Sequence, residues 1–322
     1  MTKGMSRRGL LVGTCSVVSM NIGAGLWSRA HAETSTATSR PRTRAILLGT
    51  AGGPLPKANR YQTSQVVIID DHPYLIDCGD GVGYRLVQAG VKLRELRYIF
   101  VTHLHSDHIG GYFPLLEEAW LSGMNGPLDV YASPPMQEMT KSWFDTIRYE
   151  MNIRIQDGFP PFEDHVRVHE IREPGVVFQD ELVKVTSAVV HHPPIAPAFA
   201  FRFDGPDRSI VFSGDTSMSQ ALIDLAKDAD VLVHEVEDMA RVEKFIRSMP
   251  GRNVEAGLKH HYETHTSSED VGKIATAANV KKLVLSHLSP DAVDLDLPEQ
   301  LLQTARKSFS GEIVVGNDLM EI

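Results

Sequence analysis

Three histidines and one aspartate follow directly after an apolar strand, and this short segment constrains the fold more than any other. The strand is predicted over residues 97–101 (RYIFV), which are mostly aromatic and β-branched. A helix is predicted to start at residues 112–120, so the polar residues lie on a turn between strand and helix. The alternative is a polar loop that is rich in histidine by chance. It is disfavoured by four ligand-type residues in six positions: His103, His105, Asp107 and His108.

Imidazole nitrogens and carboxylate oxygens form a ligand set that suits divalent zinc. His103 and His105 alternate in a near-extended segment and can point the same way. Asp107 and His108 follow the turn and can face a second position close by. The segment therefore predicts a metal site at the end of this strand.

This segment is similar to the His-x-His-x-Asp-His signature of the metallo-β-lactamase superfamily. The resemblance covers nearly all of the chain after its N-terminal segment. It implies an α/β fold, the αβ/βα four-layer metallo-β-lactamase sandwich, with a hydrolytic metal site between the sheets. Within the superfamily the chain most resembles the branch that holds ribonuclease Z and zinc-dependent arylsulfatases. Strands that alternate with helices along the chain agree with the α/β class.

Later segments supply the other ligands that the resemblance implies. Residues 192–202 (HPPIAPAFAFR) resemble the branch's His-Gly-Pro-x-x-Pro-Ala-x-Ala-Tyr-Arg segment, although Pro193 replaces the glycine and His191 stays an alternative ligand. Asp215 is expected to bridge two cations, the alternative being a helix N-cap. The implied site holds two Zn²⁺ ions, or another divalent metal. One ion is bound by His103, His105 and His192, the other by Asp107, His108 and His287, with Asp215 between them.

Two further segments resemble the His-Glu-Ala-Thr and His-Ser-Thr markers of ribonuclease Z. The resemblance implies that Glu235 orients His265 for proton transfer, so the expected catalytic residues are Asp107, Glu235 and His265. Val236-Glu237 stands where the branch has Ala-Thr. The alternative for His265 is a structural residue before a helix capped by Thr266. His260 and His261 are expected on the solvated surface, and contact with the substrate is the alternative.

The expected function is that of a metal-dependent ester hydrolase. The resemblance implies a dinuclear zinc enzyme that cleaves a sulfate or phosphate ester by attack of a metal-bound hydroxide, and the N-terminal segment adds the expectation that it is exported. Such an enzyme would be arylsulfatase-like or phosphodiesterase-like. The alternatives are a lactonase or β-lactamase-type carbonyl hydrolase and a non-catalytic member of the superfamily that binds a metal or another ligand.

The N-terminal segment predicts export. Arg7 and Arg8 precede a short apolar stretch, and residues 30–32 (AHA) form a small-x-small cleavage site. The stretch is too short and polar to span a bilayer, so no stable membrane anchor is expected. Hence we expect a twin-arginine signal peptide (1–32), a partner in the twin-arginine export machinery, and a periplasmic location. A flexible leader (33–42) and one hydrolase domain (43–322) follow.

The net charge limits the expected partners, and the cysteine content limits the possible disulfides. Removal of residues 1–32 takes away four basic residues and no acid, which leaves 28 basic and 41 acidic residues and a net charge of about −13. Such a surface is poor for a polyanion, so a small-molecule ester substrate and no nucleic acid are expected. A homo-oligomer is left open. Cys78 would be the only mature cysteine, which excludes an internal disulfide.

The remaining elements follow from periodicity and turn residues. The glycine-rich loop 51–54 is expected near the metals, residues 151–180 are expected to form a surface loop or lid, and 237–264 give no clear prediction. Strands are predicted at 44–50, 64–69, 74–77, 128–132, 183–190, 199–203, 209–212, 231–235, 282–286 and 312–315, and helices at 82–88, 135–149, 217–227, 267–278 and 298–308.

Overall fold

The computed structural model describes residues 41–124, 126–289 and 297–322. The predicted signal peptide and all but the last two residues of the predicted leader lie outside this part of the chain. Residues Pro41–Ile322 form one compact unit. In the described part of the chain, no helix combines the length and the apolar character that a bilayer span requires.

The first sheet has seven strands in the order β14-β1-β2-β3-β4-β5-β6. Strands β1 to β3 are antiparallel neighbours, whereas β3 to β6 run parallel. The strands are β1 (Thr43–Gly49), β2 (Ser64–Ile69), β3 (His72–Ile76), β4 (Tyr98–Phe100), β5 (Leu128–Ala132), β6 (Val166–Glu170) and β14 (Met320–Glu321).

The second sheet also has seven strands, in the order β13-β12-β11-β10-β9-β8-β7. Its β10 to β13 half is parallel and its β7 to β10 half antiparallel. The strands are β7 (Gly175–Gln179), β8 (Lys184–His192), β9 (Ile195–Asp204), β10 (Ser209–Phe212), β11 (Val231–Glu237), β12 (Lys282–Ser289) and β13 (Glu312–Val315).

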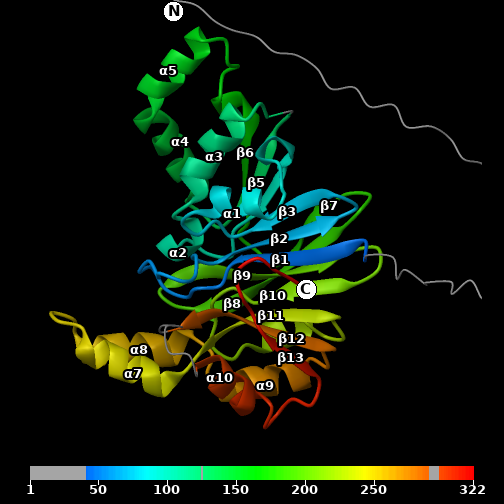
Figure 1. The fold of residues 1–322 in the computed structure, drawn as a ribbon, viewed down its shortest axis with the longest axis vertical. Coiled ribbons are helices and arrows are strands. Elements are labelled where there is room, and N and C mark those ends of the chain that lie inside the picture. Colours follow the sequence, from blue (N-terminus) through cyan, green and yellow to red (C-terminus); the bar gives the residue numbers. More distant parts are fainter. Residues whose placement is uncertain (1–40, 125, 290–296) are drawn as a thin grey trace, which may run out of the picture. The chain divides into compact units, whose positions relative to one another are not determined.

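Helices cover the outer face of each sheet, as Figure 1 shows. The first sheet is covered by α1 (Val82–Gln88), α2 (Ser106–Ile109), α3 (Tyr112–Leu121), α4 (Met136–Thr146) and α5 (Arg148–Gln156), with 3₁₀ turns at Leu93–Glu95 and Glu163–His165. The second is covered by α6 (Gln220–Leu225), α9 (Ser268–Ala277) and α10 (Leu297–Ala305). The remaining pair, α7 (Met239–Ser248) and α8 (Val254–Thr264), forms a hairpin that extends beyond the edge of the sheets (yellow in Figure 1).

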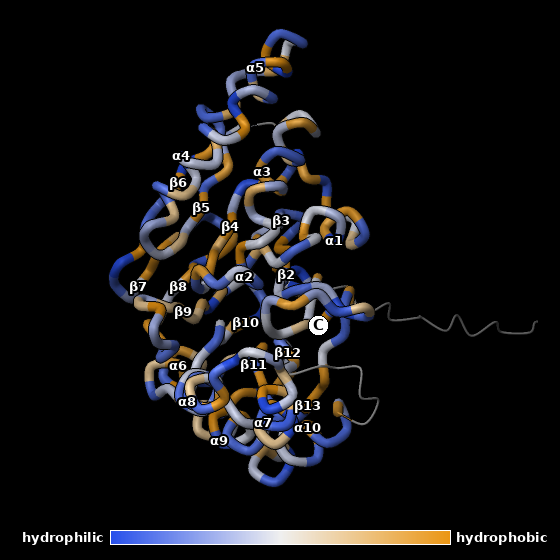
Figure 2. The backbone as a smooth tube through the Cα atoms, turned by 90° about the vertical axis from the view of Figure 1, so that its left-hand side faces the viewer, coloured by the Kyte–Doolittle hydropathy of each residue, from blue (hydrophilic) through white to orange (hydrophobic). Residues whose placement is uncertain are grey.

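The alternation of side chains along the strands explains this layering. In β1, Ile46 and Leu48 pack against the first helical layer, whereas Ala45 and Leu47 belong to the core between the sheets. Because both faces of the central strands are buried, these strands are apolar almost throughout, and hydrophobic stretches run along them in Figure 2. The structure confirms the predicted αβ/βα four-layer sandwich.

Three parts of the sequence-based prediction need correction. Residues 151–180 are not a surface loop, because they contain the end of α5 and the strands β6 and β7. These strands lie at the sheet edges and are partly exposed, so their sequences lack a continuous apolar run. The helix predicted at 135–149 is two helices, α4 and α5, and the one predicted at 217–227 shortens to α6.

Candidate metal centre

The seven expected metal ligands come together at the carboxyl ends of strands from both sheets. His103 follows β4, Asp215 follows β10, and His192 and His287 lie near the ends of β8 and β12. The carboxyl ends of strands in an open α/β sheet are the usual place for such a site. The ligand atoms form two groups, each within 4.8 Å, that share Asp215: His103, His105, His192 and Asp215; and Asp107, His108, Asp215 and His287.

In the first group three imidazole nitrogens converge on one point. Nδ1 of His105 lies 3.0 Å from Nε2 of His103 and 3.0 Å from Nε2 of His192. Nδ1 of His192 donates to the carbonyl oxygen of Thr264 at 3.0 Å, which leaves the lone pair of Nε2 pointing into the group. Burial lowers the pKa of His192 to about 4, so this ring is neutral at neutral pH, as metal binding requires.

In the second group carboxylate oxygens alternate with imidazole nitrogens. Nε2 of His287 lies 3.2 Å from Oδ2 of Asp107 and 3.2 Å from Oδ2 of Asp215. Nε2 of His108 lies 3.3 Å from Oδ1 of Asp215, without hydrogen-bond geometry. The backbone N–H of Gly53 donates to Oδ2 of Asp107 at 2.9 Å, so the glycine-rich loop does lie beside this group.

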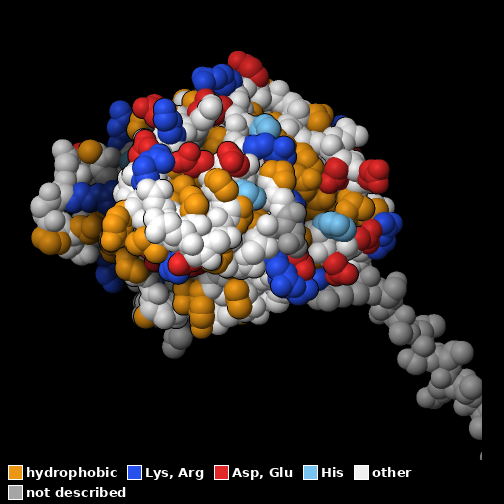
Figure 3. Space-filling view, turned by 90° about the horizontal axis from the view of Figure 1, so that it is seen from above, with side chains coloured by type: hydrophobic (Ala, Val, Ile, Leu, Met, Phe, Trp, Pro, Cys, Tyr) orange, Lys and Arg blue, Asp and Glu red, His pale blue; other side chains and the backbone are white. Residues whose placement is uncertain are grey.

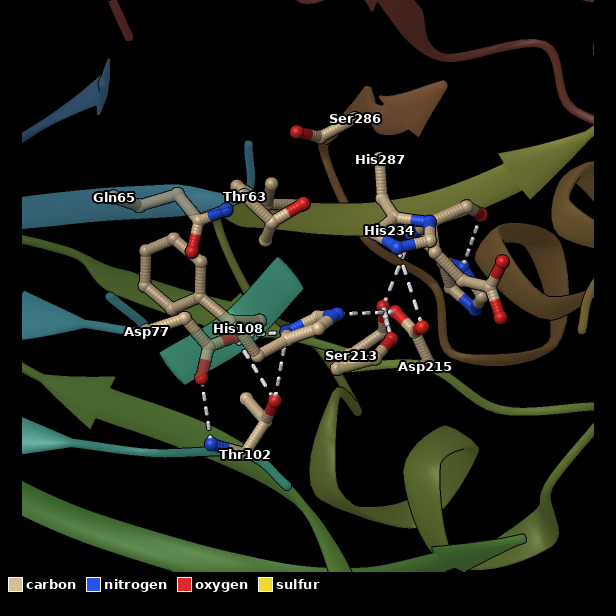
Figure 4. Close-up of a pocket in the computed structure, with 14 residues that line it drawn as sticks. Thr63, Gln65, Asp77, Thr102, His108, Ser213, Asp215, His234, Ser286 and His287 are labelled. Atoms are coloured by element: carbon tan, nitrogen blue, oxygen red, sulfur yellow. Dashed lines mark hydrogen bonds and ion pairs between the residues drawn. The ribbon is translucent and has the colours of Figure 1, made fainter. Parts of the chain in front are cut away.

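A second layer of residues orients these ligands (Figure 4). Oδ2 of Asp77 lies 2.8 Å from Nδ1 of His108, which directs Nε2 of that ring toward Asp215. The backbone N–H of Thr102 donates to Oδ1 of Asp77 at 2.7 Å. The sequence analysis did not identify Asp77, although its place at the end of β3 was a usable signal.

His287 is directed into the centre by an irregularity of β12. Glu235 pairs with Ser286 and Val236 with Leu288, so His287 is the extra residue of a β-bulge, and its φ is 49°. A Cβ at Gly52 would lie 2.6 Å from Nδ1 of His287, so only glycine fits at this position of the loop. These local features could not be derived from the sequence.

The charge of the centre fits divalent cations. Five buried carboxylates surround it, and among the described residues their ion pairs are all with histidines. Burial alone would lower the pKa of His108, but Asp215, Asp77 and Asp107 raise it well above the ordinary value, so this position favours positive charge. Because buried carboxylates need compensating positive charge, the donor set suits bound cations. The carboxylates are Asp77, Asp107, Asp215, Glu235 and Glu237.

His265 and Glu235 form a pair beside the two groups. Nδ1 of His265 lies 3.1 Å from both carboxylate oxygens of Glu235, and Oε1 of Glu235 accepts from the backbone N–H of Thr216 at 2.8 Å. Burial alone would lower the pKa of His265, but Glu235, Glu237 and Asp215 raise it well above its ordinary value. These acidic neighbours therefore favour a protonated imidazole beside the expected metal ligands.

His261 and Glu237 form a second carboxylate–imidazole pair that the sequence analysis missed. Nδ1 of His261 lies 3.0 Å from both oxygens of Glu237, and His260 also lines the centre. The expectation that His260 and His261 are solvated surface residues is wrong. Their place in an unassigned segment gave no signal, because α8 brings them to the centre only after folding.

The structure also distinguishes the alternatives that the sequence left open. His191 is exposed, whereas the ring of His192 is buried in the first group. The N-cap of α6 is Ser219, so Asp215 is not a cap. The N-cap of α9 is Ser267, not Thr266.

A pocket of about 450 Å³ opens over the centre. Its floor includes His105, Asp107, Asp215, His265 and His287. Its walls come from the loop at residues 52–57 and from the α7–α8 hairpin. A substrate can reach the centre through this pocket.

Comparisons with known proteins show the family of the chain. The family model of the anti-Pycsar protein Apyc1 matches residues 44–248. Ribonuclease Z of Mycobacterium avium (strain 104) is 32% identical over 284 residues, which cover 86% of this chain and 96% of that protein. The metallo-β-lactamase fold protein YhfI from Bacillus subtilis has a TM-score of 0.64 at 21% identity, covering 87% of this chain and 98% of YhfI. The short form of human tRNase Z has a TM-score of 0.63 at 20% identity, with the same coverages.

The comparisons overturn the expected partners. A small-molecule ester substrate without nucleic acid was predicted from net charge, and this prediction is wrong because the relatives are ribonuclease Z enzymes. Net charge is an average over the surface, whereas binding depends on the local field. Basic and acidic side chains are interspersed on the face in Figure 3, so a negative net charge does not mean that basic groups are missing from the surface. The chain belongs to the ribonuclease Z branch of the metallo-β-lactamase superfamily and to the family of the anti-Pycsar protein Apyc1.

Proposed function

We propose that this chain is a metal-dependent phosphodiesterase that hydrolyses a phosphodiester bond of RNA. The observation that carries the proposal is that Asp215 is shared by two sets of ligand atoms beside the paired His265 and Glu235. These two sets would each hold a divalent cation, and zinc suits their nitrogen and oxygen ligands best. Such cations would supply an activated water molecule and would stabilise the charge that develops on the phosphoryl group. RNA as the substrate is supported by the ribonuclease Z relatives.

The chain's own residues would orient the substrate and supply a proton. Glu235 holds Nδ1 of His265, so Nε2 is the atom that can give a proton to the leaving oxygen in the pocket. Thr216 fixes Glu235 through its backbone N–H. The backbone N–H of Gly53 donates to Oδ2 of Asp107, which holds this carboxylate in one orientation beside the reacting group.

A substrate panel tests the proposal. The full-length chain, loaded with zinc, is assayed on single-stranded RNA, bis(p-nitrophenyl) phosphate, p-nitrophenyl sulfate and a nitrophenyl lactone analogue. We expect both phosphodiesters to be cleaved, and a chelator to abolish the cleavage. Asp215→Asn should lose at least 100-fold in turnover, on the order of the effect of removing one catalytic group. Asp224→Asn, an exposed carboxylate on α6, is the matched control and should have normal turnover.

Other outcomes would assign a different function. Faster cleavage of the sulfate ester than of either phosphodiester would make the chain an arylsulfatase-like enzyme. Cleavage of the lactone alone would favour a carbonyl hydrolase. Bound metal without turnover on any substrate would indicate a non-catalytic member of the superfamily.

A further inference from the structure

The pocket over the metal centre contains an arginine that the hydrolytic chemistry does not use. Arg252 lies in the connection between α7 and α8 and is exposed, and it lines the pocket together with His105, Asp215 and His265. Among the described residues it has no carboxylate partner. Its Nη1 contacts Sδ of Met249 at 3.3 Å, and a thioether is a weak acceptor. The guanidinium is therefore available to bind an anion that enters the pocket.

The hairpin that carries Arg252 is basic, in contrast to the rest of the chain. Residues 239–264 hold five Lys or Arg residues and three Asp or Glu residues, whereas the whole chain has 32 basic and 41 acidic residues. Lys244 and Lys259 of the same hairpin are also exposed. The local field at this side of the pocket is thus more positive than the net charge of −9 implies.

The hairpin is fixed to the metal centre by buried contacts. Glu237 at the end of β11 bonds His261 of α8, and the carbonyl of Thr264 accepts from Nδ1 of His192. Gly257 of α8 leaves room for the arginine side chain, because a Cβ there would lie 3.0 Å from Nε of Arg252. The fold therefore holds Arg252 at a defined place beside the site of hydrolysis.

A second cation, Lys57, lines the pocket from the loop at residues 52–57. Lys57 follows the apolar residues Pro54, Leu55 and Pro56, and its Nζ donates to the carbonyl of Leu288 at 3.2 Å. Phe245 of α7 lines the pocket on the side of the hairpin. A bound molecule would thus contact the expected metal ligands, the apolar side chains of the walls, and the positive charges of Arg252 and Lys57. This arrangement suits a ligand with more than one phosphate group.

Resting on the proposed phosphodiesterase function, we propose that Arg252 binds a second phosphate, adjacent to the scissile one, on a nucleic-acid strand. The ligand class is a single-stranded polynucleotide with at least one phosphate next to the cleaved linkage. Arg252 is then a specificity-determining residue, because a substrate with one isolated phosphodiester makes no use of it.

The first test measures binding without turnover. A fluorescently labelled six-nucleotide RNA with a phosphorothioate backbone is titrated with the full-length, zinc-loaded chain at several salt concentrations. For Arg252→Gln we expect weaker binding and a slope of log K against log salt that is smaller by about 0.7, the value for one lost phosphate contact on a single strand. Arg247→Gln is the control, since Arg247 lies in α7 of the same hairpin, pairs with Glu243 at 2.7 Å and does not line the pocket.

The second test compares turnover on matched substrates. The dinucleotide UpU has one phosphodiester, whereas pUpU and UpUp each carry one further phosphate on opposite sides. Arg252→Gln should lower kcat/KM by about tenfold on one of the two phosphorylated substrates. It should leave UpU and bis(p-nitrophenyl) phosphate within about twofold of wild type. Arg252→Lys should keep part of the activity, because it keeps the charge but not the fork of donors.

The outcomes separate this inference from the proposed function. An unchanged salt slope for Arg252→Gln, an equal loss in Arg247→Gln, or no binding of the RNA by the wild type would each overturn the phosphate site. An equal loss on UpU and on the phosphorylated dinucleotides would also overturn it. A wild type that cleaves none of the phosphodiesters but shows the expected change of slope would refute the phosphodiesterase proposal and keep the phosphate site.

Discussion

Nδ1 of His261 lies 3.0 Å from both carboxylate oxygens of Glu237, and this contact joins helix α8 to the end of strand β11. Glu237 is buried, and its Oε1 also lies 4.0 Å from Nδ1 of His265. One carboxylate therefore links the hairpin, which forms a wall of the pocket, to the histidine that we propose as the general acid.

Removal of His261 should destabilise the protein. His261→Leu leaves the buried carboxylate of Glu237 without its main partner, and breaking such a pair costs about 3 kcal/mol. Urea unfolding should show this loss, and hydrogen exchange should show faster exchange of the α8 amides. The double variant Glu237→Leu with His261→Leu removes both partners and should recover most of the stability. A double variant as unstable as the single one would contradict this account.

The chain should bind two metal ions. The two ligand groups share only Asp215, so replacing any other residue of one group leaves the ligands of the other group intact. Protein purified without chelator should contain about two equivalents of zinc by elemental analysis. Asp107→Ala should lower the content to about one equivalent, whereas His191→Ala, which alters the exposed neighbour of a ligand, should leave it unchanged. A single equivalent in the wild type would refute the two-metal centre.

The fold and the first four expected ligands could be predicted because both depend on residues that are close in sequence. The turn from His103 to His108 follows a buried strand, and the alternation of apolar residues in β1 marks a strand with two covered faces. Asp215 and His287 carry no such local signal, and they could be proposed only because their segments resemble those of the superfamily.

The hairpin and its contribution to the centre could not be predicted. Residues 239–264 are amphipathic but flank no recognisable ligand, and His261 meets Glu237 only through the packing of α8 on β11. The direction of His287 depends on a bulge whose register is set by pairing with β11. Contacts between distant segments of this kind leave no local pattern in the sequence. Net charge gave the wrong partner for the same reason, since it contains no information on where the charges lie.

Asp129 should make the stability depend on acid pH. Its carboxylate accepts from Nε of Arg167 at 2.9 Å and lies 2.7 Å from Nε2 of His169. Burial alone would raise the pKa of Asp129, but the hydrogen bonds from Arg167 and His169 lower it below the ordinary value. The unfolded state therefore takes up this proton first as the pH falls. The ionised Asp129 carboxylate contributes its full stabilisation above its pKa in the unfolded state, which is about 4. This stabilisation is lost as the pH falls through its lower pKa in the folded state.

Urea unfolding between pH 3 and 7 tests the direction of this pH dependence of stability. Asp129→Asn should be less stable than the wild type at neutral pH, and the difference should shrink toward pH 3. Metal loss at low pH affects both proteins and cancels in the difference. Asp145→Asn, an exposed carboxylate on α4, is the control and should show a small difference at every pH. A difference for Asp129→Asn that grows as the pH falls would contradict the prediction.

The N-terminal segment should direct export, a proposal that rests on Arg7, Arg8 and residues 30–32. Replacing both arginines with lysine should retain the precursor in the cytoplasm. Cell fractionation and mass spectrometry of the exported wild type should find a mature N-terminus at Glu33. Replacing Arg40 and Arg42 with lysine is the control, because these residues follow the cleavage site. Unchanged periplasmic delivery of the Arg7→Lys, Arg8→Lys variant would refute a twin-arginine signal.

His265 should act as a general acid and not as a metal ligand. Both ligand groups that share Asp215 are complete without it, and Glu235 occupies its Nδ1 at 3.1 Å. His265→Ala should therefore keep the metal content of the wild type. It should lose roughly 10²–10⁴-fold in turnover on RNA, whose leaving group needs a proton, and much less on bis(p-nitrophenyl) phosphate, whose leaving group does not. His260→Ala removes a neighbouring imidazole, with a ring centroid 5.6 Å from that of His265, and should not alter the ratio between the two substrates. Equal losses on both substrates, or the loss of one metal equivalent, would show that His265 has a different role.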